Sequence, residues 1–218
     1  MITLNGLAAV GFASAGVAYL GLALLLLVRQ APAGAGRLLI AALLGESAWA
    51  IVLAAMMSGA RLPAPVMGAV EALRVFLWIA FLLSLLRTAL QDERPDAPLR
   101  RATNSGLIAA ATLFAATFGI EVLAFGERAA FVVKLVGAVY GLVCLEQVYR
   151  NSPANRRWAL KFMAIGLLAL FGFDLLLYAE ALLFSRLNGA LWIARGYANA
   201  LVMPLIASWP SYETTAAT

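Results

Sequence analysis

The sequence of 218 residues contains no histidine and only one cysteine. The absence of histidine excludes histidine-ligated metals, Ser-His-Asp and Cys-His catalysis, and a phosphoacceptor histidine. A single cysteine, Cys144, excludes an internal disulfide and a cysteine-cluster metal site. In an apolar helix we expect Cys144 to be a small packing residue. The sequence therefore predicts no catalytic residue, no metal site and no cofactor.

Charged residues are also scarce, at 12% of the chain, whereas a typical soluble domain has about 25%. Hydrophobic residues make up 64%, and the mean hydropathy is +0.91. A soluble protein of this size could not hide so much apolar surface, because a folded soluble protein needs a polar shell. The predicted fold class is therefore all-α, a polytopic transmembrane helix bundle.

A membrane-spanning helix needs about 20 mostly apolar residues. Seven windows meet this criterion: residues 6–28, 38–58, 66–88, 104–125, 129–149, 158–184 and 191–207. The first window lacks the basic start of a signal peptide and its apolar run is too long for one, so it is interpreted as a retained helix. Because no connector is long enough to separate two domains, we expect one transmembrane domain over residues 1–207 and a short C-terminal tail over 208–218.

Basic residues are distributed unevenly between the connectors. Of the 16 Lys and Arg residues, ten lie in the first, third and fifth connectors and three in the second, fourth and sixth. The positive-inside rule places the richer set in the cytoplasm, so we expect the N-terminus outside and the C-terminus inside the cell. Since the basic residues lie between apolar runs, the expected partner is the lipid bilayer and not nucleic acid.

Several charged residues lie within the predicted spans, where each costs about 2.5–3.5 kcal/mol on insertion scales. The outer half of the predicted bundle collects four acids and three bases: Glu71, Glu121, Asp174, Glu180, Arg74, Lys134 and Arg195. Spread over five helices, these groups could neutralise one another. Glu180 is six residues from Asp174 and is therefore expected on a different helix face.

Local spacing predicts particular partners for some of these groups. Glu71 and Arg74 are three residues apart, a spacing that suits an ion pair on one helix. Asp174 and Tyr178 are four residues apart, so the phenol is expected to hydrogen-bond the carboxylate. Glu46 is expected to be a lone buried acid, kept neutral or hydrogen-bonded by a neighbouring helix.

Three interpretations of these charges stay open. They could form a structural network that fixes helix packing, or an outward-facing polar pocket that senses a small molecule, an envelope component or protons. They could also line a path for protons or ions.

Polar residues recur at fixed places among the apolar residues from Val136 to Ala207. With their neighbours, the positions that matter here are Glu146-Gln147 with Tyr149-Arg150-Asn151, Arg156-Arg157-Trp158 with Lys161-Phe162, Asp174 with Tyr178, Ala181-Leu182-Leu183-Phe184, and Trp192 through Arg195-Gly196, Asn199-Ala200-Leu201 and Pro204-Leu205-Ile206. With these residues the segment resembles the membrane region of the PEP-CTERM/exosortase-system sensor histidine kinases of the PrsK type. The segment covers about a third of the chain. Because of this resemblance, Asn199 joins the charged residues named above as a candidate for ligand sensing or for structural support.

The resemblance implies a multi-pass sensor in a bacterial inner membrane. Its partners would be a cytoplasmic kinase domain or response regulator of the same system, with a homodimer as a further option, and it would control exopolysaccharide and PEP-CTERM protein expression. The chain departs from this family after Thr218, where further membrane helices and a kinase core would follow, so we expect a truncated form. Without histidine or an ATP-binding motif, this chain alone is not expected to be a kinase.

The main alternative is a small transporter or channel, because paired intramembrane charges suit ion coupling. No inverted repeat or pair of broken helices supports it. Against a membrane enzyme, the sequence offers no cluster of charged residues at a membrane edge that would suggest a reaction. A retinal photoreceptor would need a lysine in the last span, where Arg195 stands instead.

Overall fold

The computed structural model describes residues 4–29, 34–91, 97–123 and 125–216. Within these ranges, the side chains of residues 64, 90–91, 97–102, 121–122, 155, 159 and 209–216 are not described. Over the described residues the chain is helical with short connectors and contains no β-strand.

In the described ranges seven helices build the fold: α1 (Leu4–Val28), α2 (Ala35–Met57), α3 (Ala64–Gln91), α4 (Ala97–Val122), α5 (Glu127–Asn151), α6 (Ala154–Phe184) and α7 (Gly189–Ala216). The shortest has 23 residues, which at about 1.5 Å per residue exceeds the roughly 30 Å hydrocarbon core of a bilayer. Each helix contains a window long and apolar enough to cross a membrane. The all-α, seven-span prediction is confirmed, and the chain is a multi-pass membrane protein.

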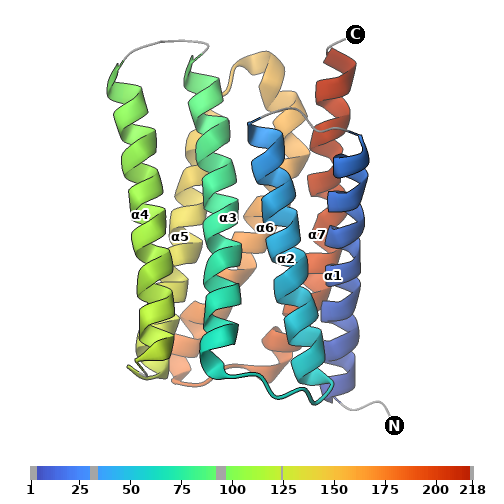
Figure 1. Cartoon of the computed structure of the whole chain (residues 1–218), viewed down its shortest axis with the longest axis vertical. Helices are drawn as coiled ribbons and strands as arrows, with labels where there is room; N and C mark the ends of the chain where they lie inside the picture. Colours follow the sequence, from blue (N-terminus) through green and yellow to red (C-terminus); the bar gives the residue numbers. More distant parts are fainter. Residues whose placement is uncertain (1–3, 30–33, 92–96, 124, 217–218) are drawn as a thin grey trace.

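Neighbouring helices run in opposite directions along the bundle (Figure 1). Helices α1, α3, α5 and α7 begin at the end that carries the N-terminus, here called the N-terminal end. Helices α2, α4 and α6 begin at the opposite end, here called the C-terminal end. Helix α1 packs against α2 and α7, α3 packs against α2, α4 and α5, and α6 packs against α5 and α7.

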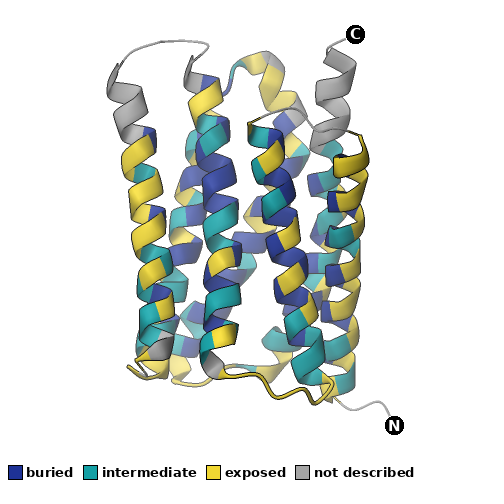
Figure 2. Ribbon diagram, in the orientation of Figure 1, coloured by how far each residue is buried: buried dark blue, intermediate teal, exposed yellow. Residues whose placement is uncertain are grey.

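Burial separates an inner face from an outer face on most helices (Figure 2). The largest fully buried side chains are aromatic or basic and include Phe12, Trp49, Arg74, Trp78 and Arg195. Large apolar side chains cover the outside, as the 77% exposure of Leu201 illustrates. An apolar exterior around a partly polar interior suits a protein whose solvent is lipid.

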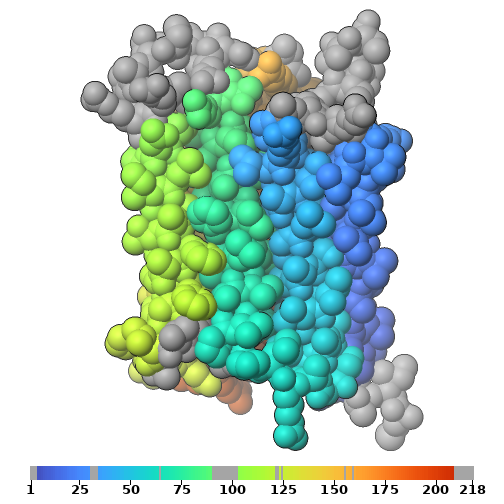
Figure 3. Space-filling view, viewed as in Figure 1, coloured from blue at the N-terminus to red at the C-terminus, as the bar shows by residue number. Residues whose placement is uncertain are grey.

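Helix α4 is the most peripheral element. It lies at the edge of the face on which α4, α3, α2 and α1 stand side by side (Figure 3). Only 17% of its apolar window is buried, compared with 56% for α3. It therefore adds little to the core but covers one side of α3.

Glycines allow two close contacts between helices. A Cβ atom on Gly196 of α7 would lie 2.8 Å from the backbone nitrogen of Phe12 on α1. A Cβ atom on Gly141 of α5 would lie 2.5 Å from the ring of Phe171 on α6. Both pairs follow the rule that small residues let membrane helices approach closely.

The observed helices begin and end within a few residues of the predicted windows, except at two places. Helix α4 begins seven residues earlier than predicted, at Ala97. Helix α7 continues to Ala216, into the residues set apart above as a tail. Hydropathy detects only the part of a helix that lies in lipid, and both extensions are more polar than the windows beside them.

Candidate functional site

Six ionisable side chains meet inside the bundle and are here called the charge network: Glu46, Glu71, Arg74, Lys134, Asp174 and Arg195. They come from α2, α3, α5, α6 and α7. Arg195 lies six residues into α7, and Asp174 ten residues before the end of α6. At about 1.5 Å per residue these positions are roughly 9 Å and 15 Å from the N-terminal end, well within the apolar part of the bundle.

Arg74 joins two acids on neighbouring helices. Its Nη1 atom donates to Glu46 Oε1 at 3.1 Å and to Oε2 at 3.4 Å. Its Nη2 atom donates to Asp174 Oδ2. One planar guanidinium on α3 therefore ties α2 to α6, using the fork of donors that distinguishes arginine from lysine.

Arg195 makes the second bridge. Its Nε atom donates to Asp174 Oδ1 at 2.8 Å, and its Nη2 atom lies 2.7 Å from the same oxygen. The Nη2 atom also donates to Glu71 Oε1 at 2.9 Å. Since Glu71 is on α3, Arg195 connects α7 to both α6 and α3.

Glu71 extends the network to α5. Its Oε2 atom lies 3.1 Å from Lys134 Nζ, and its Oε1 atom accepts a hydrogen bond from the Tyr178 hydroxyl. The six charges thus form one chain of alternating sign, in the order Lys134, Glu71, Arg195, Asp174, Arg74 and Glu46. The Glu46 end is capped by Trp78, whose Nε1 atom donates to Oε2 at 2.7 Å.

Aromatic rings surround the two arginines. Both guanidinium groups face the Trp49 ring on α2. The guanidinium carbon lies 4.4 Å from the ring centroid in Arg74 and 4.6 Å from it in Arg195. Arg195 also lies 5.3 Å from the Tyr178 ring and 5.4 Å from the Trp192 ring. Such contacts add cation–π attraction, which grows when the groups are desolvated.

The network is balanced and almost completely buried. Among the described side chains of the network, three acids face three bases, so their formal charges cancel. Side-chain exposure is 3% or less for five of the six residues, and 14% for Lys134. Balance makes this burial tolerable, because an uncompensated charge in a low-dielectric interior costs several kcal/mol.

Hydrogen bonding in this region is nevertheless incomplete. Among the described protein groups, buried side-chain atoms without a partner include Arg74 Nε, Arg195 Nη1, Trp49 Nε1, Asn199 Oδ1 and Tyr19 Oη. The protein groups therefore leave part of the hydrogen-bonding capacity of this region unused, in contrast to a fully satisfied network.

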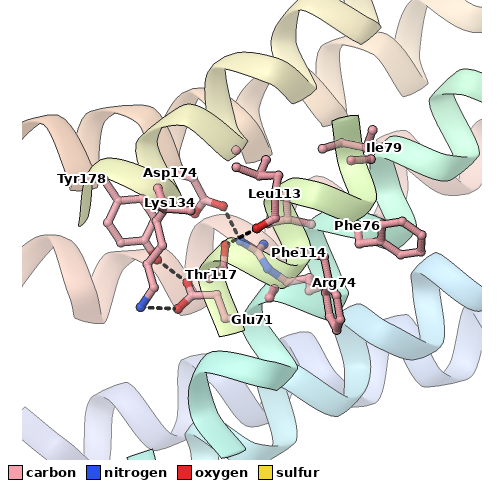
Figure 4. A pocket seen from close by; sticks show the side chains of 15 residues that line it. Glu71, Arg74, Phe76, Ile79, Leu113, Phe114, Thr117, Lys134, Asp174 and Tyr178 are labelled. Atoms are coloured by element: carbon pink, nitrogen blue, oxygen red, sulfur yellow. Dashed lines mark hydrogen bonds and ion pairs between the residues drawn. The ribbon is translucent and has the colours of Figure 1, made fainter. Parts of the chain in front are cut away.

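A pocket adjoins the Lys134 end of the network (Figure 4). It lies between α3, α4, α5 and α6 and has a cavity volume of about 20 Å³, which is room for about one water molecule. Its polar side is formed by network residues and its apolar side by α3 and α4 (Figure 4). The described residues place no group of three or more His, Cys, Asp or Glu side chains where they could hold a metal ion.

Two local pairings predicted from spacing are wrong. Glu71 and Arg74 form no ion pair with each other, because their side chains reach partners on other helices. The Tyr178 hydroxyl donates to Glu71 on α3 and not to Asp174 one turn away on its own helix. Asp174 is already engaged by both arginines. Contacts between helices override the local spacing in both cases.

Glu46 is not a lone acid, because it pairs with Arg74 and accepts a hydrogen bond from Trp78. The alternative that a neighbouring helix would hydrogen-bond it is confirmed, since both partners are on α3. Sequence reasoning also missed Trp49 and Trp78 as members of the site. A usable signal was their spacing, because Trp49 follows Glu46 by three residues and Trp78 follows Arg74 by four.

The remaining candidates lie at the margin of the network or outside it. Asn199 is buried one turn after Arg195 and donates to its backbone oxygen at 2.9 Å. Glu180 accepts a hydrogen bond from Asn188 at 2.8 Å, near the α6–α7 connector, so it does not belong to the network. The side chain of Glu121 lies outside the described part of the structure.

No protein-family model, curated protein or solved structure matches this chain. The resemblance over residues 136–207 stays a prediction, and the site is interpreted below from its own geometry.

Proposed function

We propose that this chain is a signal-input module of a bacterial inner membrane. The observation that carries the proposal is the alternating chain of six buried charges, which links five helices and has one end beside a pocket. The resemblance of residues 136–207 to sensor kinases of the PrsK type agrees with this role. It adds a cytoplasmic kinase domain or response regulator as partner, a second copy of the chain as a further one, and control of exopolysaccharide and PEP-CTERM protein expression as output.

The mechanism would be a shift between two packings of the bundle. A stimulus at the pocket changes the position of Lys134 or Glu71, and Glu71 shares Arg195 with Asp174. The perturbation thereby reaches α7, the helix that runs to the C-terminal end (Figure 1). A stimulus can shift such an equilibrium only by as much as its affinities for the two packings differ.

The orientation of the bundle belongs to this proposal. The three connectors with ten basic residues join helices at the C-terminal end, which the positive-inside rule assigns to the cytoplasm. The network then lies nearer the outer surface. Signals from outside would enter through the half of the bundle that holds the pocket.

The proposal is tested by replacing Asp174 with Asn in the native bacterium and measuring exopolysaccharide and PEP-CTERM transcripts. Asp174→Asn removes the acid between the two arginines, so transcript levels should change when they are normalised to the amount of membrane-inserted protein. Glu146→Gln is the matched control, because Glu146 forms an exposed pair with Arg150 at 3.5 Å and should leave output unchanged. Unchanged transcripts in Asp174→Asn would exclude the network from signalling.

A small transporter or channel is the second candidate, favoured by the pocket that adjoins paired charges inside the bundle. Purified protein in liposomes distinguishes the two. Proton or ion flux above that of empty liposomes, abolished by Asp174→Asn, would favour transport over signalling.

A further inference from the structure

We infer that the start of α6 binds the anionic head group of a phospholipid, whose acyl chain lies along the outer face of the same helix. The head-group residues, here called the basic site, are Arg157, Trp158 and Lys161, and all three are exposed. They follow the α5–α6 connector at the C-terminal end of the bundle (Figure 1). The inference goes beyond the proposed sensory function and does not depend on it, because lipid binding is measured on purified protein.

The charge near this connector has one sign. Between Glu146 and Asp174 the sequence contains no acid and four basic residues: Arg150, Arg156, Arg157 and Lys161. Glu146 forms an exposed pair with Arg150 at 3.5 Å. Among the described side chains, no acid pairs with Arg157 or Lys161. An anionic partner therefore complements the charge of the basic site.

Arg157 is held in position by the end of α5. Its Nε atom donates to the backbone oxygen of Ser152 at 2.7 Å, and its Nη2 atom donates to that of Arg150 at 2.9 Å. Carbonyl groups at the end of a helix have no partner within the helix, so these two bonds give Arg157 a fixed place beside the connector. A cation that is already ordered loses less conformational freedom when it binds an anion.

Trp158 places the basic site at the level of lipid head groups. Its side chain is 66% exposed, and the Nζ atom of Lys161 lies 5.9 Å from its ring centroid. Tryptophan is enriched where a membrane meets water. The apolar window of α6 begins at Leu160, between the two residues. The basic site therefore lies at the boundary between head groups and hydrocarbon.

The outer face of α6 continues the basic site with apolar side chains. Ile165 and Leu168 follow Lys161 by four and seven residues, so the three share one helix face. Their exposed fractions are 43% and 55%. A phospholipid with its phosphate at Lys161 can lay an acyl chain over both residues. This order of cation and apolar surface fits a lipid better than a free phosphate or an acidic protein segment.

Native mass spectrometry of the full chain, released from detergent micelles, tests the preference for anionic lipid. Dioleoyl phosphatidylglycerol and dioleoyl phosphatidylcholine are titrated separately, so that only the head group differs. The first phosphatidylglycerol should bind at least about tenfold more tightly, because each basic side chain near a membrane surface contributes about fivefold. Equal affinities for the two lipids would overturn the inference.

Exposed basic residues at opposite ends of α6 allow a matched comparison. Lys161→Gln should reduce the preference for phosphatidylglycerol about fivefold, whereas Lys161→Arg should retain it. Arg186→Gln removes the same formal charge from the α6–α7 connector at the other end of the bundle and should leave the preference unchanged. Circular dichroism verifies that each variant is folded. Equal reductions in Lys161→Gln and Arg186→Gln would indicate diffuse attraction and overturn the site.

Photo-cross-linking in phosphatidylcholine nanodiscs locates the bound lipid. A phosphatidylglycerol with a diazirine in one acyl chain should label the α6 peptide around Ile165 and Leu168 more strongly than the matching phosphatidylcholine probe does. Unlabelled phosphatidylglycerol should displace the label, whereas glycerol phosphate and poly-glutamate at the same concentration of charge should not. Displacement by glycerol phosphate would assign the site to a free phosphate, and displacement by poly-glutamate to an acidic protein. Either result, or labels confined to other helices, would overturn the inference.

Discussion

Arg74 shows how one residue can hold the interior of a membrane protein together. It is fully buried and contacts an acid on α2, an acid on α6 and an indole on α2. None of these partners is close to it in the sequence. Its importance therefore comes from being shared by three side chains, and its removal leaves two acids with too little compensation.

We expect Arg74→Met to lower the free energy of unfolding by about 3–5 kcal/mol, the range measured when one partner of a buried ion pair is removed. The measurement is unfolding in mixed detergent micelles, followed by circular dichroism. Adding Glu46→Gln should restore part of the loss, because a neutral amide needs no cation. If the double variant were as unstable as the sum of the two single variants, Arg74 and Glu46 would not be energetically coupled.

Two tyrosines allow a matched test of hydrogen bonding. The Tyr178 hydroxyl donates to the buried carboxylate of Glu71, whereas the Tyr197 hydroxyl donates to the backbone oxygen of Leu7 near the surface. Because hydrogen bonds to charged groups contribute about 1.5–3 kcal/mol, Tyr178→Phe should destabilise the bundle by that amount. Tyr197→Phe should cost less, at about 0.5–1.5 kcal/mol. Equal losses in detergent unfolding would contradict the charged character of the Tyr178 bond.

At the scale of the helices, contact between α1 and α7 closes the bundle. Gly196 allows this contact, because a Cβ there would lie 2.8 Å from the Phe12 nitrogen and 2.9 Å from the Gly11 carbonyl carbon. The obstacle is backbone, which cannot rotate away as a side chain can. The same helix carries Arg195, so the spacing of α1 and α7 also sets the position of the charge network.

Gly196→Ala is therefore expected to destabilise the protein, despite the higher helix propensity of alanine. Gly21→Ala is the control on α1, where a Cβ would meet nothing within 4 Å, and it should be neutral or stabilising by up to about 1 kcal/mol. Unfolding in detergent measures both variants. A stabilising Gly196→Ala would mean that α1 and α7 separate easily at this point.

The helices could be predicted from the sequence because the bilayer leaves few alternatives. Each span must be long, apolar and internally hydrogen-bonded, so hydropathy alone locates α1 to α7. The membership of Asp174 and Arg195 in a buried site also followed from the cost of charge in lipid. The partners of these two residues could not be predicted, because pairing depends on the rotation of each helix about its axis and on its axial position relative to its neighbours. Spacing along one helix suggested Tyr178 for Asp174, whereas the bundle brings Glu71 of another helix to Tyr178.

For the whole molecule, the central question is which end of the bundle faces the cytoplasm. The apolar helices would fit the membrane equally well with either end inside the cell. The orientation is therefore assigned from the distribution of basic residues. The exposed pair of Glu146 and Arg150 lies close to the C-terminal end, and the exposed residue Arg61 lies in the α2–α3 connector at the N-terminal end. These positions are suited to labelling from one side of the membrane.

The single cysteine makes such labelling direct, because Cys144 is buried and only 4% exposed. Wild-type protein in intact cells with a permeabilised outer membrane should resist a membrane-impermeant maleimide. Arg61→Cys should react in these cells, and Arg150→Cys only after the inner membrane is disrupted, because the basic end is expected in the cytoplasm. The reverse pattern would place the network and its pocket nearer the cytoplasm, so that a stimulus from outside the cell could not reach them through the outer half. Reaction of both cysteines in intact cells would be incompatible with the alternating helix directions of the seven-span bundle.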